Sequence, residues 1–119
     1  MKPVWLALVV AASLSAAPRN AAEAFRQVQD TQTFTGIITD DMCPLGDHGR
    51  MRMGATDAEC VKACIDAHRA AYVLYDGKSA YVLTGQQTPE RFAAQKVRVV
   101  GTLDEKTKEI RVESITAAK

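Results

Sequence analysis

Residues 72–84 read YVLYDGKSAYVLT, and they contain the clearest structural signal in the chain. Two short runs rich in β-branched and aromatic side chains, 72–75 and 80–84, flank the residues Asp76-Gly77-Lys78-Ser79. An Asp-Gly pair between two such runs is typical of a β-hairpin with a tight turn. The stretch therefore predicts two antiparallel strands.

Further strands are predicted on both sides of this hairpin. Residues 33–39 carry β-branched and aromatic side chains around Gly36, where we expect the strand to bend. Residues 97–103 and 109–115 are predicted to form a second hairpin, joined by the charged turn 104–108. Together these strands predict a mainly β domain.

Two helices are predicted between the strands. Thr56 is a good N-cap and a glutamate follows at the capping-box spacing, so we expect a helix over residues 57–69. Thr88 as N-cap and Pro89 at the first helical position predict a short helix over residues 88–94. The helices fall between strands 1 and 2 and between strands 3 and 4. This order predicts a small five-stranded Greek-key β-barrel of the OB type.

The N-terminal residues predict export. Lys2 precedes an apolar run at 4–14, and small residues follow it, as in a secretory signal peptide. A membrane span would need about 20 apolar residues, so an uncleaved anchor is less favoured. We expect a signal peptide at 1–17, a polar leader at 18–32 and one domain at 33–119. The mature protein would be periplasmic or secreted, with no membrane contact after signal cleavage.

Charge and motifs exclude several classes of function. The chain has 15 Lys and Arg and 14 Asp and Glu, so no strong field attracts nucleic acid. No Ser/His/Asp order, phosphate-binding glycine loop or Cys-x2-Cys motif is present, so no enzyme is indicated. The adjacent carboxylates Asp40 and Asp41 are expected to cap a turn or to support a loop histidine, and not to form an acid–base pair.

Soft metal ligands are concentrated in an insertion at residues 40–69. It holds all three cysteines, both histidines and three of the four methionines. Thiolate, imidazole and thioether groups select zinc and copper(I), whereas calcium and magnesium require oxygen. The candidate metal ligands are Cys43, His48, Cys60 and Cys64, with Met51, Met53 and His68 as secondary candidates.

Helical spacing places Cys60, Cys64 and His68 on nearly one face of the predicted helix. Two cysteines four residues apart in a helix are too distant for a relaxed disulfide, but a metal ion can bridge them. We therefore predict a Cys3His-type site for one zinc or copper(I) ion, completed by Cys43 and His48. Two alternatives apply to the secondary candidates: His68 caps the C-terminal end of the helix, and Met51 and Met53 pack on the barrel.

Two other interpretations of the cysteines remain open. An odd number of cysteines in an oxidising compartment leaves at least one unpaired. In the first alternative, Cys43 forms a disulfide with Cys60 or Cys64, and the protein is a disulfide-stapled OB-like module that binds a ligand or a periplasmic protein partner. In the second, it is a thiol redox protein, because a position near a helix N-terminus would lower the pKa of Cys60.

One sequence pattern links the first strand to the insertion. It runs through Gly36, Thr39, Asp40, Cys43, His48, Cys60 and Cys64. With its Gly-x-x-Ser/Thr-Asp strand end followed by Cys, His and Cys-x3-Cys, the chain resembles a group of small exported bacterial OB-fold-like proteins of unknown function. The resemblance implies an OB-like fold and carries no activity.

Overall fold

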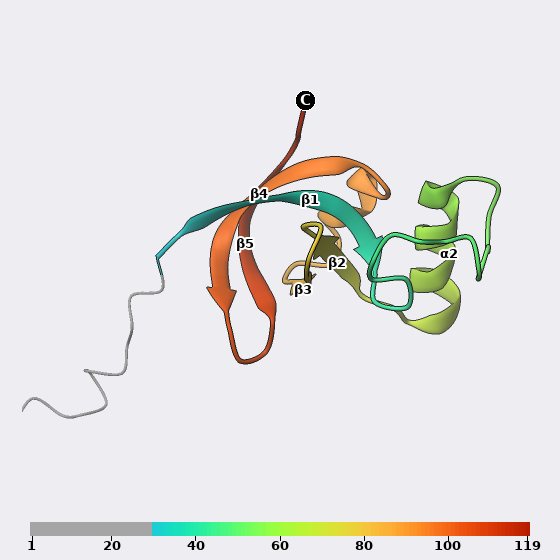
Figure 1. The fold of residues 1–119 in the computed structure, drawn as a ribbon, viewed down its shortest axis with the longest axis horizontal. Helices are drawn as coiled ribbons and strands as arrows, with labels where there is room; N and C mark the ends of the chain where they lie inside the picture. Colours follow the sequence, from blue (N-terminus) through green and yellow to red (C-terminus); the bar gives the residue numbers. More distant parts are fainter. Residues whose placement is uncertain (1–29) are drawn as a thin grey trace, which may run out of the picture.

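The computed structural model describes residues 30–119, in which a five-stranded sheet closes into a ring (Figure 1). The predicted signal peptide and nearly all of the predicted leader lie outside the described residues. The elements in chain order are β1 (Gln32–Asp40), α2 (Asp57–His68), β2 (Tyr72–Tyr75), β3 (Ala80–Leu83), the 3-10 helix η1 (Pro89–Phe92), β4 (Lys96–Asp104) and β5 (Glu109–Ala117). The mainly β class predicted from the sequence is confirmed.

The ring has the strand order β1-β2-β3-β5-β4, with β4 returning to β1. All neighbours are antiparallel except β3 and β5, which pair in parallel through Val82 with Glu109 and Leu83 with Ile110. This short parallel pairing closes the ring. No helix of residues 30–119 is both long enough and apolar enough to cross a bilayer.

The turn between β2 and β3 forms as the Asp-Gly pair predicts. The Asp76 carboxylate accepts backbone N–H groups of Lys78 and Ser79, each at 2.8 Å. These bonds lower the pKa of Asp76, because they favour its charged form. Gly77 has a φ of +98°, a conformation that side chains with a Cβ rarely adopt.

Gly36 lies where β1 passes from one neighbour to the next. The first part of β1 pairs with β4 as far as Ile37, and the part from Ile37 to Asp40 pairs with β2. A Cβ at Gly36 would collide with the backbone carbonyl of Tyr75. A glycine is therefore required for the close approach of β2 at this point.

The two predicted helices differ in how well their ends agree with the sequence. Thr56 caps α2 in a full capping box with Glu59, as predicted. The helix ends at His68, because Arg69 adopts the left-handed conformation with a φ of 54°. The segment predicted at 88–94 is only a short 3-10 helix. Thr88 takes the predicted N-cap position and Pro89 begins the helix, but the Thr88 backbone is already helical and its side chain makes no capping bond.

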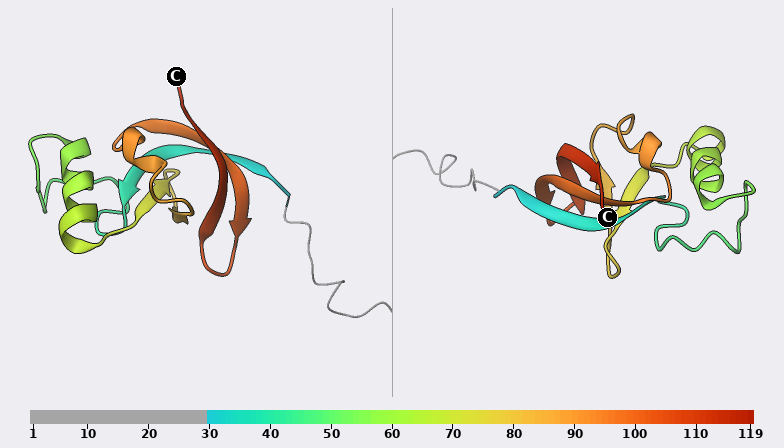
Figure 2. Two further views of the ribbon diagram at one scale, coloured as in Figure 1. Left: turned by 180° about the vertical axis from the view of Figure 1, so that it is seen from behind. Right: turned by 90° about the horizontal axis from the view of Figure 1, so that it is seen from above.

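The core of the ring is formed by apolar side chains from every strand. Helix α2 adds Val61 to this core, and its cysteines Cys60 and Cys64 are also fully buried. Figures 1 and 2 show α2 beyond the end of β1, with the β4–β5 hairpin on the opposite side of the ring. The loop 41–56 lies between the end of β1 and the start of α2, so this end of the molecule contains the whole predicted ligand cluster.

Candidate metal centre

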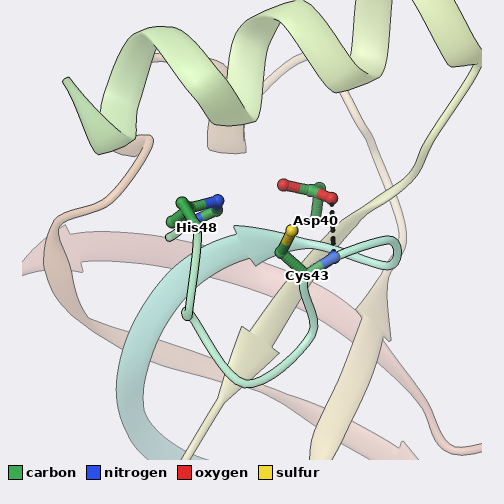
Figure 3. A group of neighbouring side chains, drawn as sticks. All are labelled: Asp40, Cys43 and His48. Atoms are coloured by element: carbon green, nitrogen blue, oxygen red, sulfur yellow. Dashed lines mark hydrogen bonds between the residues drawn. The ribbon is translucent and has the colours of Figure 1, made fainter. Parts of the chain in front are cut away.

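Asp40, Cys43 and His48 come together where β1 ends and the loop begins. Figure 3 shows the three side chains in the space beneath α2. Their ligand atoms, a carboxylate oxygen, the sulfur and a ring nitrogen, all lie within 4.8 Å of one another. The exposed fractions are 0 % for Asp40, 8 % for Cys43 and 3 % for His48. The group is thus a compact and buried set of oxygen, sulfur and nitrogen donors that could hold a metal ion.

Asp40 is the last residue of β1, and it organises the turn that follows. Its Oδ1 accepts the backbone N–H groups of Met42 and Cys43, each at 3.0 Å; Figure 3 draws the bond to Cys43. The second oxygen, Oδ2, is buried and has no hydrogen-bond partner in residues 30–119. A buried carboxylate oxygen without a partner is costly, and a bound cation would remove that cost.

His48 is held in one tautomer by Thr39. The Thr39 hydroxyl donates to the Cys43 carbonyl at 2.8 Å and lies 3.4 Å from His48 Nε2. A hydroxyl has one proton, and the carbonyl takes it, so we infer that Nε2 carries the ring proton and donates to Thr39. This leaves Nδ1 unprotonated, and within the described part of the chain Nδ1 has no partner. A neutral imidazole with a free lone pair is the form that binds metals.

Cys43 is held in place by three hydrogen bonds of its backbone. Its carbonyl accepts from both Thr39 and the Gly46 N–H, and its own N–H is bonded to Asp40. Burial, followed by the negative charge of Asp40, raises the pKa of the Cys43 thiol. A raised pKa is the opposite of what a nucleophilic cysteine needs.

The same three residue types could also suggest a catalytic Cys-His-Asp triad, but the geometry differs. In a triad the carboxylate holds the histidine ring by a hydrogen bond. Here neither Asp40 Oδ2 nor His48 Nδ1 is bonded within residues 30–119, and His48 Nε2 faces Thr39. Together with the raised thiol pKa, this favours metal binding over nucleophilic catalysis.

Cys60 links the loop to the helix. Its thiol donates to the Met51 carbonyl at 3.2 Å and accepts the Met53 N–H at 3.4 Å. The side chain therefore has both a donor and an acceptor partner already. Its sulfur is outside the group of ligand atoms that lie within 4.8 Å of one another.

Cys64 lies one turn further along α2 and is fully buried. Burial raises the pKa of its thiol to about 11, and the charges of Asp40, Cys60 and Cys43 add to the effect. Cys64 is therefore close enough to Asp40 and Cys43 to interact with them electrostatically. Its sulfur, like that of Cys60, is not among the mutually close ligand atoms.

The secondary candidates lie outside the group. His68 is exposed at the last turn of α2, where a positive charge is favoured by the helix dipole. Met51 and Met53 are 43 % and 39 % exposed. The sequence predicts that Asp40 caps a turn or supports the loop histidine. The turn-capping role is confirmed by its bonds to the Met42 and Cys43 N–H groups, and the structure also places its carboxylate in the group.

All three cysteines are free thiols in the structure, so neither disulfide of the alternative interpretation is formed. The raised pKa values of Cys43 and Cys64 disfavour these two thiols as the attacking thiolate of a redox pair. Comparison with protein-family models, curated proteins and solved structures found no match to the chain.

Proposed function

We propose that this protein binds one transition-metal ion, zinc or copper(I), in the group of Asp40, Cys43 and His48. The proposal rests on two buried atoms, Asp40 Oδ2 and His48 Nδ1, that have no partner within residues 30–119 and belong to side chains that meet beside a thiol. Buried polar atoms are nearly always paired, so two such atoms on neighbouring ligand-type side chains call for a common partner. A metal ion satisfies both at once.

Cys64 is the best candidate for a fourth ligand. It is fully buried on the helix that covers the group, and the charges of Asp40 and Cys43 act on its thiol. Carboxylate, imidazole and thiolate donors form the tetrahedral sites that zinc prefers. The proposed set replaces Cys60 of the predicted Cys3His site by Asp40, because the Cys60 thiol is already bonded to the loop backbone.

The proposal also includes the type of barrel and the cellular compartment of the protein. The strand order β1-β2-β3-β5-β4 with one parallel pairing supports an OB-type barrel. The signal-like residues 1–17 support export to the periplasm or beyond. In that oxidising compartment a bound ion would keep Cys43 and Cys64 from forming disulfides. The protein would then act as an exported metal carrier, a sensor or a metal-stabilised module.

The first test is elemental analysis of the protein purified from a periplasmic fraction without chelator. We expect about one equivalent of zinc or copper, and free thiols that become reactive only when a chelator is added. A protein that binds neither ion when titrated, or that contains a disulfide and one free thiol, would contradict the proposal.

Replacing Asp40 by asparagine is expected to weaken metal binding by about tenfold or more. Asparagine keeps Oδ1, which the Met42 and Cys43 N–H groups need, and replaces the anionic Oδ2 by a donor. Asp41→Asn is the matched control, since that exposed side chain only accepts the Ala71 N–H. Equal affinities in the two variants, measured by competition with a chromogenic chelator, would exclude Asp40 as a ligand.

Metal binding is expected to weaken as the pH falls. The pKa values of Cys43 and Cys64 are raised, so both thiols are protonated at neutral pH in the metal-free protein. An ion that binds both must displace two protons, and its affinity should change by up to about 100-fold per pH unit. Zinc competition titrations between about pH 6 and pH 8 measure this slope. An affinity independent of pH would mean that neither thiol is a ligand.

A further inference from the structure

A solvent-facing pocket of about 340 Å³ lies on the loop outside the buried group. Its wall includes Met42, Cys43 and Met51. Cys43 thus belongs both to this pocket and to the buried group, where it is the most exposed of the three ligand-type side chains. An ion that reaches Asp40 and His48 from solvent is therefore expected to pass Cys43.

The two methionines at this pocket, Met42 and Met51, do not lie in the hydrophobic core. Met42 is 40 % exposed and Met51 is 43 % exposed, so neither fills the interior of the ring. A thioether is a neutral, soft ligand that favours copper(I) over zinc. The pocket is also lined by one acidic and one basic residue, Asp47 and Arg50.

We propose that Met42, Met51 and Cys43 form an outer capture site for a monovalent soft ion, copper(I), which then moves to the buried group. This inference rests on the proposed function of that group. Capture forms bonds from copper(I) to the two thioethers and to the Cys43 sulfur, whose proton leaves to solvent. In the transfer, the thioether bonds break and a bond to His48 forms, while the Cys43 sulfur stays bound. Copper remains in the same oxidation state throughout.

The test compares Met42→Leu/Met51→Leu with the single variant Met53→Leu. Leucine nearly conserves the volume of methionine and removes only the sulfur. Met53 is the matched control, because it lies on the same loop with 39 % exposure but is not on the pocket wall. Silver(I) serves as a redox-inert probe for copper(I), and zinc serves as the probe for the buried group. Stopped-flow absorbance at the thiolate-to-silver band gives the silver uptake rate.

We expect the double variant to take up silver(I) at least about tenfold more slowly than the wild type, with zinc affinity and the Met53→Leu variant unchanged. Silver uptake at the wild-type rate would overturn the capture site and leave the proposed function standing. An equal loss of silver and zinc binding would also overturn it, since the methionines would then act only through packing. A wild-type protein that binds zinc but not silver refutes the inference alone, whereas one that binds neither ion refutes the proposed function as well.

Discussion

Replacing His48 by glutamine is expected to lower the affinity for the metal ion by about 100-fold or more, while replacing His68 by glutamine leaves it unchanged. Loss of a side chain that only orients a ligand costs about 10- to 100-fold, so the loss of a ligand should cost at least as much. His48 is buried and its Nδ1 has no partner among the residues that the structure describes, whereas His68 is exposed at the end of α2. The two variants remove the same chemical group from opposite environments.

Glutamine is the appropriate replacement because its side-chain amide can donate to Thr39, as we infer for His48 Nε2. The loop is then expected to keep its conformation, which circular dichroism and the unfolding midpoint of the metal-free protein would check. Affinities are measured by competition with a chelator for zinc. If both variants bind like the wild type, His48 is not a ligand, and if both lose the ion equally, the effect does not depend on the buried group.

Replacing Leu83 by alanine is expected to lower the free energy of unfolding by about 2–5 kcal/mol. Leu83 is 1 % exposed and belongs to the core, and its backbone pairs with Ile110 in the parallel contact that closes the ring. Removing its side chain leaves a cavity that the surrounding strands can fill only in part. Because stabilities of small domains are of order 5–15 kcal/mol, this one change should bring the protein close to unfolding.

Leu45→Ala is the matched control for this prediction. Leu45 is 62 % exposed on the loop, so its replacement should change the free energy of unfolding by no more than about 0.5 kcal/mol. Both variants and the wild type are compared by urea denaturation in the presence of a chelator, so that metal binding does not contribute. A Leu83→Ala protein as stable as Leu45→Ala would mean that the Leu83 side chain contributes little to the packing of the core.

Local signals in the sequence predicted most of the secondary structure. The Asp76-Gly77 turn and the Thr56 capping box are formed by hydrogen bonds between residues only two or three positions apart. Both could therefore be predicted without tertiary information. Thr88 takes the predicted N-cap position but makes no capping bond, because preference for an N-cap position does not guarantee the extended backbone that capping requires. There the chain forms only one turn of 3-10 helix, between β3 and β4.

The candidate site was predicted by residue type and only partly by arrangement. Cys43 and His48 meet in the structure, but the third member of the group is Asp40, and Cys60 is bonded to the loop backbone instead. Spacing along a helix predicts which side chains share a face. It does not predict which of these side chains lie close to the turn that follows β1. The exposure of Met51 and its place beside Cys43 on one pocket wall are likewise features of the folded loop.

The sequence by itself determines the strand and helix positions and the ligand chemistry, because these depend on side-chain preferences over a few neighbouring residues. The closure of the ring between β3 and β5, the burial of Asp40 and the tautomer of His48 come from tertiary structure alone. Each of these three features depends on contacts between residues that only the folded chain brings together. Asp40 Oδ2 and His48 Nδ1, the two atoms that indicate a metal ion, lack a partner within residues 30–119 because folding has removed water from both.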